Sequence, residues 1–429
     1  MPRETLFSWT SHGPWMLHEW LAAVVAWAAH RAGGWWGVGA LQAILYAGAL
    51  SSRGSRARLA SPSGPRPLPS GYALVPLALA AVVLRETVSP RAQWFTNLLL
   101  ALSLATLLPR AAVDEEPPWR RDALWWVIPL GLLWTQLHGG APHLVVVTGA
   151  VFVARPSPRT LLAAIASVAL TMAGPYGWRV HEHFLSARPL LPELREWWPL
   201  SRALAARWPP AYVALGLAAL AVVSLVARAR AGRRVRAEAL VFAVFAVMAA
   251  RHLRFVAELC VVSSAVAAAG LSRLRVDPKR ELIAALVALT AVVVGASRDG
   301  RAWGAGWSDK FDPRVAALLR DPALTGPMFN SYNLGGWLIW EAPSRPVFID
   351  GRAFTAYPAS RVAEMVAVVR DPPRVASVVD RWGANLAVLT RAGRGDPVAR
   401  ALARSPEWAV VYVSPSAAVL RRRETRPAR

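Results

Sequence analysis

Long apolar runs separated by short, basic connections recur from Trp35 to Ala296. The runs are Trp35 to Leu50, Tyr72 to Leu84, Gln93 to Leu108, Ala123 to Leu137, His143 to Ala154, Leu161 to Gly174, Ala211 to Ala227, Ala237 to Ala250, Phe255 to Leu271 and Leu282 to Ala296. A chain of 429 residues in which 55% are hydrophobic and 17% are charged has too few polar side chains to cover a soluble core of that size. The sequence therefore predicts a mainly α, polytopic helical membrane protein with about ten transmembrane helices, several of which need flanking residues to reach the roughly 20 that cross a bilayer.

Basic residues fill alternate connections between these runs. The clusters are Arg53, Arg56, Arg58 and Arg66; Arg110, Arg120 and Arg121; Arg155 and Arg159; Arg228, Arg230, Arg233, Arg234 and Arg236; and Arg273, Arg275, Lys279 and Arg280. Two runs separate each cluster from the next, so all of them can lie in the cytoplasm, as the positive-inside rule requires. This topology explains the net charge of +23 more simply than nucleic-acid binding does, because basic patches interleaved with aromatic residues are absent.

This orientation divides the chain into residues 1–34, residues 35–297 and residues 298–429. The first part lies outside the cytoplasm, and within it Leu17 to His30 has helical periodicity with polar ends, which predicts a helix in the membrane interface. Residues 35–297 form the membrane domain. Residues 298–429 have a soluble composition with alternating β-rich and helical stretches, which predicts a small extracytoplasmic α/β domain. The β-rich stretches are Pro346 to Asp350, Leu386 to Thr390 and Ala409 to Val413, and the helical ones are Ser360 to Arg370, Arg374 to Trp382 and Pro397 to Arg404.

Polar side chains near a membrane are costly unless they are paired, hydrated or used, so the outward-facing set is where we look for chemistry. His18 and Glu19 place an imidazole beside a carboxylate at the interface, a pair suited to proton abstraction or to binding a hydroxyl-rich acceptor. The alternative is an acid that merely complements the dipole at a helix N-terminus. Glu19 is therefore a candidate catalytic residue and His18 a candidate substrate ligand.

Arg251, His252 and Arg254 end one run on the outward face, where the positive-inside rule does not account for basic residues. Two guanidiniums can hold a lipid phosphate, since the arginine fork matches phosphate oxygens, although arginines also snorkel to headgroups. His138 precedes two glycines, which suits either a ligand-facing imidazole beside a closely approached backbone or a plain tight turn. All four are candidate substrate-binding residues.

The C-terminal part adds a second polar group. Asn330, Tyr332 and Asn333 form a polar turn before a predicted helix, and Asp350 and Arg352 follow a predicted buried strand. Polar residues at the carboxyl end of a strand are a frequent site in α/β folds. Asp350 is a candidate catalytic carboxylate and the other four are candidate substrate ligands, with a structural Asp350–Arg352 ion pair as the alternative. His181 and His183 do not predict a metal site, because residues two apart lie on different faces of a helix.

A resemblance to a known family rests on short segments spread over nearly the whole chain. They are, in order, PRETLFSWTSHGPWMLHEWL, WTQLHGG, PYGWRVHEH, ARHLRF and FNSYNLGGWLIWEAPSRPVFIDGR. Together these segments resemble a large group of bacterial membrane proteins identified as GT-C-like glycosyltransferases. The most specific part is the combination of FNSYNLGGW with VFIDGR, and HEWL comes next.

The resemblance implies a multi-pass protein of the bacterial inner membrane that takes a sugar from a polyprenyl-phosphate carrier and transfers it to an acceptor on the outer face. The implied partners are a lipid-linked sugar donor and the bilayer. In the wider superfamily an acidic residue of the first external loop acts as base or metal ligand, so a divalent metal is the one cofactor left open. Arg251 and Arg254 would then bind the carrier phosphate, and Glu19 or Asp350 would assist the acceptor hydroxyl.

Two other functions stay open. Members of the group begin with a further span and an acidic, Trp-rich stretch before the segment equivalent to Pro2 to Trp9, which implies either an upstream start codon or a lost catalytic acid. A lost acid would favour a non-catalytic relative that binds a glycolipid or a partner enzyme. A transporter is less attractive, because charges in mid-span are scarce and the main one, Glu258, lies about one helical turn from Arg254.

Overall fold

The computed structural model describes residues 5–11, 15–51, 71–85, 91–108, 125–187, 195–271, 277–297, 310–391 and 395–423. It divides into two compact units. The helical unit consists of residues 18–180 and 194–305, and the mixed unit consists of residues 1–17, 181–193 and 306–429. Several arginines of the predicted cytoplasmic clusters lie outside the described residues, namely Arg53, Arg56, Arg58, Arg66, Arg110, Arg120, Arg121, Arg273 and Arg275.

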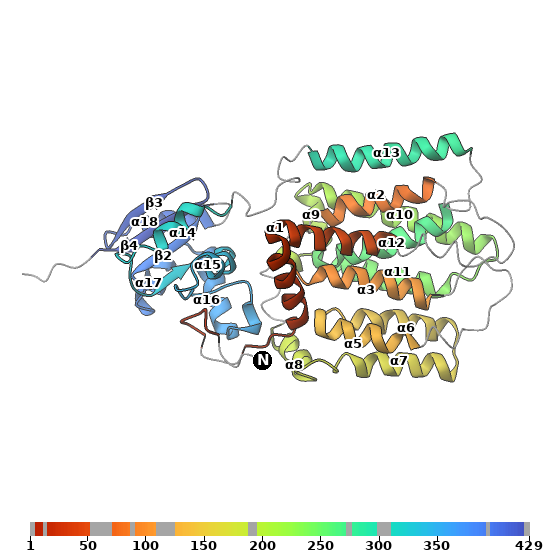
Figure 1. Cartoon of the computed structure of the whole chain (residues 1–429), viewed down its shortest axis with the longest axis horizontal. Helices are drawn as coiled ribbons and strands as arrows, with labels where there is room; N and C mark the ends of the chain where they lie inside the picture. Colours follow the sequence, from red (N-terminus) through yellow and green to blue (C-terminus); the bar gives the residue numbers. More distant parts are fainter. Residues whose placement is uncertain are drawn as a thin grey trace, which may run out of the picture. The chain divides into compact units, whose positions relative to one another are not determined.

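The helical unit contains a helix at every predicted apolar run. Its helices are α1 (Trp20–Ser51), α2 (Gly71–Arg85), α3 (Gln93–Leu107), α5 (Val127–Leu137), α6 (Pro142–Ala154), α7 (Pro158–Leu170), α9 (Leu200–Ala205), α10 (Pro209–Arg230), α11 (Arg236–Arg251), α12 (Val256–Leu271) and α13 (Pro278–Ser297), with short 3-10 turns η3 (Arg195–Trp197) and η4 (Leu253–Phe255). In Figure 1 the longer helices lie side by side as a bundle, and α12 contacts α2, α3, α10 and α11. The prediction of a mainly helical fold is confirmed.

Helix α1 bends in the middle. Gly33 and Gly34 have non-helical backbone angles, and Gly34 has a positive φ of 57°, which a side chain would disfavour. Figure 1 shows the segment before the bend lying crosswise to the other helices, while the segment after it runs along the bundle. The glycine pair therefore lets one continuous stretch of helix serve two directions, and it separates the predicted interfacial helix from the first apolar run.

Two of the described helical segments, Pro209–Arg230 and Leu253–Leu271, are long and apolar enough to cross a membrane by length and composition. The other apolar helices, Leu74–Leu84, Gln93–Leu107, Val127–Leu137, Pro142–Ala154 and Pro158–Leu170, are shorter. Membrane crossing by these shorter helices stays a prediction.

The mixed unit is built on a four-stranded sheet in the order β1-β2-β4-β3. Its strands are β1 (Met328–Asn330), β2 (Leu386–Thr390), β3 (Trp408–Val413) and β4 (Ala417–Arg422), and its helices include α14 (Pro313–Leu319), α15 (Gly335–Glu341), α16 (Ala359–Arg370), α17 (Arg374–Arg381) and α18 (Asp396–Ala403). Strands β1 and β2 are parallel, and the other pairs are antiparallel. The helix α8 (Arg179–Ala187) crosses from the helical unit into the mixed unit.

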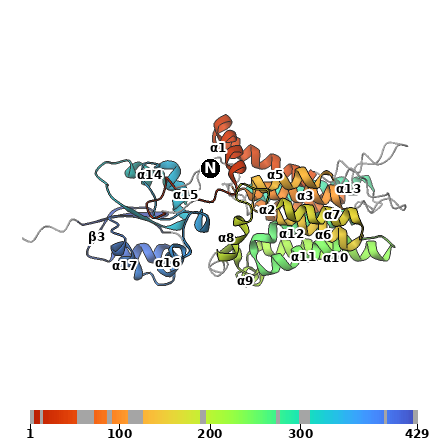
Figure 2. The same ribbon diagram turned by 90° about the horizontal axis from the view of Figure 1, so that it is seen from below.

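Alternation along the central strand β2 explains the layers of the mixed unit. Leu386 and Val388 belong to a core with α14 and α15, whereas Ala387 and Leu389 belong to a second core with α16, α17 and α18. Successive side chains of a strand point to opposite faces, so a fully apolar strand needs cover on both sides. Figure 2 shows the sheet with α14 and α15 on one face and α16 and α17 on the other.

One predicted strand is wrong. Pro346 to Asp350 is not a strand, and only Val347 forms an isolated parallel bridge, with Ser8. The backbone of the next two residues hydrogen-bonds a side chain instead of a strand. The Asn330 side chain accepts from the Phe348 amide (2.8 Å) and donates to the Ile349 carbonyl (2.8 Å). A buried backbone must have hydrogen-bond partners, and here a side-chain amide replaces a neighbouring strand.

Candidate functional site

Glu19 contacts both histidines that the sequence singled out beside it. Its Oε1 atom lies 3.4 Å from Nε2 of His18 and 3.3 Å from Nε2 of His138. Glu19 immediately precedes α1, and His138 follows the last residue of α5, so two helix ends far apart in the sequence meet at this carboxylate. Oε2 of Glu19 has no hydrogen bond or ion pair with any residue that the structure describes. Two imidazoles thus hold Oε1, and the Glu19 side chain is 36% exposed, so it is accessible to a further group.

Electrostatics set the charge states of this pair. Burial by itself would raise the pKa of Glu19, but the hydrogen bond from His18 and the positive charges of His138, His18 and Arg254 lower it to about 2. Burial lowers the pKa of His138 to about 4, against the opposing attraction of Glu19. At neutral pH the site therefore holds a carboxylate beside a neutral imidazole.

The stability of the helical unit should consequently depend on pH through His138. An unfolded histidine takes up a proton near pH 6.5, whereas the folded pKa of His138 is about 4. Between these values the unfolded chain binds the extra proton, so stability falls by about 3 kcal/mol as the pH drops from 6.5 to 4. We expect His138→Gln to remove this loss in thermal unfolding of the detergent-solubilised protein. An identical pH dependence in the two proteins would contradict a buried, neutral His138.

Arg254 supplies the positive charge of the site. Its guanidinium carbon lies 4.6 Å from the centre of the Trp197 ring, and Nη1 lies 3.9 Å from Oε1 of Glu196. Arg91, just before α3, binds the other oxygen of Glu196 at 2.6 Å. A carboxylate thus lies between two guanidiniums at the place where an anionic ligand would be attracted.

The other two candidates of the RHLR segment, His252 and Arg251, lie in different environments from that of Arg254. His252 lies edge-on to Trp197, with Nδ1 3.0 Å from the Trp197 carbonyl oxygen, so it fixes the η3 turn. Arg251 is the exposed last residue of α11. Of the three candidates, Arg254 is the one whose charge acts on Glu19 and His138.

Glu258 lies below the Arg254 turn and is buried. The Gln93 amide donates to Oε1 of Glu258 (2.9 Å) and to the backbone carbonyl of Arg254 (3.0 Å), and His143 Nε2 lies 3.8 Å from the same Oε1 atom. Gln93 therefore links the Glu258 carboxylate to the turn that carries Arg254.

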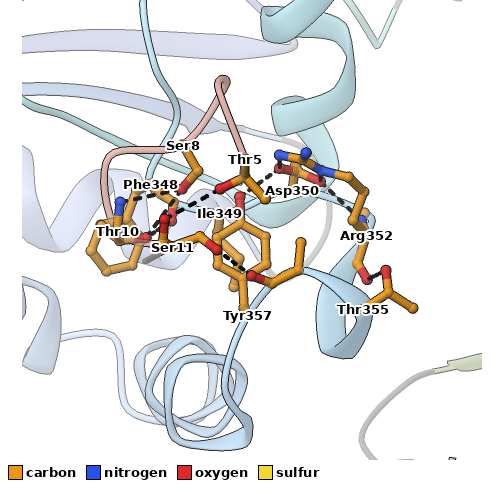
Figure 3. Close-up of polar contacts among 12 residues, drawn as sticks. Thr5, Ser8, Thr10, Ser11, Phe348, Ile349, Asp350, Arg352, Thr355 and Tyr357 are labelled. Carbon is orange, nitrogen blue, oxygen red and sulfur yellow. Dashed lines mark hydrogen bonds and ion pairs between the residues drawn. The ribbon is translucent and has the colours of Figure 1, made fainter. Parts of the chain in front are cut away.

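In the mixed unit, Asp350 is fully engaged. Its Oδ1 accepts from the backbone amide (2.9 Å) and Nε (2.8 Å) of Arg352, and its Oδ2 accepts from Nη2 of Arg352 (2.6 Å) and the hydroxyl of Tyr357 (2.5 Å). Figure 3 shows this cluster beside the segment Thr5–Ser11, in which Thr10 donates to the Phe348 carbonyl and Ser11 to the Ala356 carbonyl. Burial and the charge of Asp350 raise the pKa of Tyr357. The geometry favours the structural alternative for Asp350 and Arg352.

The remaining candidates of the mixed unit are Asn330, Tyr332 and Asn333, and they differ in burial. Asn330 is fully buried, and its side-chain amide hydrogen-bonds the backbone of residues 348 and 349. A Cβ atom on Gly335 would lie 2.3 Å from the Ile349 carbonyl oxygen, so the glycine permits the turn after Asn330 to approach this segment. Tyr332 is half-buried, its hydroxyl 3.5 Å from the Gly351 carbonyl, and Asn333 is exposed. The FNSYNLGG and VFIDGR segments therefore fit each other as packing partners.

The sequence analysis did not single out four residues that contact the site residues or their partners, namely Arg91, Gln93, Glu196 and Thr96. None of them stands in a motif with recognisable spacing. Among the described residues, no group of three or more His, Cys, Asp or Glu side chains is placed to hold a metal ion. No family model matches the chain, and no curated protein matches it.

Proposed function

We propose that the protein is a multi-pass glycosyltransferase of the bacterial inner membrane, which moves a sugar from a polyprenyl-phosphate carrier to an acceptor on the extracytoplasmic face. The observation that carries the proposal is the contact of Glu19 with His138, from two helix ends, within reach of the positive charge of Arg254 on the η4 turn. The sequence resemblance described above agrees with this chemistry.

The membrane part of the proposal is supported by the outer surface of the helices. Large apolar side chains are exposed along several of them, including Leu162 (65%) on α7, Val223 (63%) on α10 and Val287 (62%) on α13. Soluble monomers rarely expose contiguous apolar patches beyond a few hundred Å², because that surface is costly in water. Helices of 11 to 16 residues reach only about 17–24 Å, so flanking tryptophans and arginines would have to extend them to the hydrocarbon thickness of about 30 Å.

The proposed reaction uses the two charged groups in different roles. Arg254 holds the carrier phosphate, which is the leaving group, while Oε2 of Glu19 accepts a hydrogen bond from the attacking hydroxyl of the acceptor and takes its proton. The acceptor oxygen forms a bond to the anomeric carbon as the bond from that carbon to the phosphate oxygen breaks, which inverts the configuration. A phosphate bound to Arg254 also cancels positive charge near Glu19, and this change raises the pKa of Glu19 toward the range of a useful base.

Carrier binding tests the role of Arg254. We expect Arg254→Ala to weaken binding of a polyprenyl phosphate to the nanodisc-embedded protein about tenfold or more, because one charge-assisted contact is lost. Arg202→Ala is the matched control, since Arg202 also lies over a tryptophan, 3.6 Å from the ring centre of Trp198, but is not among the groups with the largest effect on the pKa of Glu19. Equal affinities of Arg254→Ala and wild type in isothermal titration would contradict the assignment.

A second candidate function is a non-catalytic protein that binds a lipid-linked sugar. The low pKa of Glu19 favours it, because a carboxylate with a pKa of about 2 is a weak base unless a ligand raises it. This function predicts carrier binding with no turnover, so the two candidates differ in a measurable product.

A further inference from the structure

A buried chain of hydrogen bonds reaches His138 from the side opposite Glu19. The indole N–H of Trp134 donates to Oγ1 of Thr96 at 2.8 Å, and Oγ1 lies 2.7 Å from Nδ1 of His138. The backbone N–H of Gly140 donates to the same Nδ1 atom at 3.1 Å. Trp134 and Thr96 are fully buried, so these groups have little access to water.

The direction of these bonds fixes where the imidazole carries its proton. A backbone amide can only donate, so Nδ1 of His138 must be an acceptor and has no hydrogen. The Thr96 oxygen already accepts from Trp134 and can use its own hydrogen toward Nδ1. A neutral imidazole with a bare Nδ1 carries its proton on Nε2, the atom that lies 3.3 Å from Oε1 of Glu19.

Gly140 makes this arrangement sterically specific. A Cβ atom at Gly140 would lie 2.3 Å from Oγ1 of Thr96 and 3.0 Å from Nδ1 of His138. The His-Gly-Gly sequence suggests that some group approaches the glycine backbone closely. Within the described structure, Thr96 of α3 approaches the backbone of Gly140.

We propose that Thr96 and the Gly140 amide hold His138 as the Nε2–H tautomer, which makes Thr96 a positioning residue for Glu19. In this state His138 donates to Oε1 of Glu19 and cannot compete with it for the acceptor proton. The hydrogen bond also fixes which carboxylate oxygen faces His138. The effect on transfer rests on the proposed function, whereas the tautomer itself does not.

The test combines the ¹⁵N chemical shifts of the His138 ring with transfer kinetics. In nanodisc-embedded protein carrying ¹⁵N-histidine, with the signals assigned by their loss in His138→Gln, we expect a pyrrole-type Nε2 and a pyridine-type Nδ1 at pH 7. Thr96→Val leaves the weaker Gly140 amide as the one group that holds Nδ1, so the share of the Nδ1–H tautomer should rise and the transfer rate should fall roughly tenfold. Thr96→Ser keeps the hydroxyl and should restore both the shifts and the rate.

Thr148→Val is the matched control. Thr148 is also a buried threonine of the helical unit, but its hydroxyl bonds Ser167 and the Leu144 carbonyl, so the His138 shifts and the rate should stay unchanged. A protonated Nδ1 in the wild type, or wild-type shifts in a folded Thr96→Val, would overturn the proposal. A wild type with the expected shifts but without transfer would instead overturn the proposed function and leave the tautomer assignment standing.

Discussion

Replacing Glu19 by glutamine is expected to lower the rate of sugar transfer about 10²- to 10⁴-fold, the range typical of removing a general base. Glutamine keeps the size of the side chain and can still hydrogen-bond an imidazole, but it does not take a proton from the acceptor hydroxyl. Carrier binding should change far less than the rate, because Arg254 rather than Glu19 is proposed to hold the phosphate. The measurement is transfer of labelled sugar by nanodisc-embedded protein, with carrier affinity determined on the same samples.

Glu182→Gln provides a control with the same local sequence character. Glu182 lies between His181 and His183 in the sequence, but its side chain is exposed on α8. Its substitution should leave the rate unchanged. A Glu19→Gln protein that transfers sugar as fast as the wild type would remove Glu19 from the mechanism.

Replacing Asp350 by alanine is expected to destabilise the mixed unit by about 3–5 kcal/mol, as for the loss of one partner from a buried ion pair. Arg352, which is 16% exposed in this pair, and the buried Tyr357 hydroxyl would both lose their acceptor. Hydrogen exchange should then speed up in peptides that cover Met328 to Tyr357. Asp371→Ala, which removes an exposed ion pair with Arg374, should change stability by less than about 1 kcal/mol.

This experiment also separates the two roles considered for Asp350. Asp350→Asn keeps the shape of the side chain and removes its charge. If Asp350 were the base, Asp350→Asn would abolish transfer while hydrogen exchange in the mixed unit stayed as in the wild type. The arrangement of Asp350 predicts the reverse, with faster exchange in the mixed unit.

The helices of this protein were predictable because apolar runs of a dozen or more residues leave few alternatives. Strand β2 was predicted at its observed bounds, since Leu386–Thr390 is a short apolar run buried on both faces. Strand β1 was missed because it ends in Asn330, a residue typical of turns, and β4 was missed because it ends in arginines. The stretch Val347 to Asp350 has a strand-like composition, but its backbone hydrogen-bonds the Asn330 side chain. The local sequence pattern does not predict this contact.

The candidate site could be predicted only in part. His18, Glu19, His138 and Arg254 stand out because polar groups at the ends of apolar runs are unusual. Thr96 does not, since a threonine inside an apolar helix is ordinary, and its role depends on a contact with a histidine on another helix. The same is true of Glu196, whose partners Arg91 and Arg254 lie on separate segments. Pairings of this kind follow from the tertiary fold and not from spacing along the chain.

Turnover of a lipid-linked sugar distinguishes a glycosyltransferase from a protein that only binds the carrier. Purified protein in nanodiscs is incubated with radiolabelled polyprenyl-phosphate hexoses and with membrane extract from cells that lack the protein as the source of acceptor. We expect wild-type protein to move label from the carrier to an acceptor in the extract, and Glu19→Gln to leave the label on the carrier. Binding of the carriers by wild-type protein with no transfer of label would rule out the proposed transferase activity and favour the non-catalytic function.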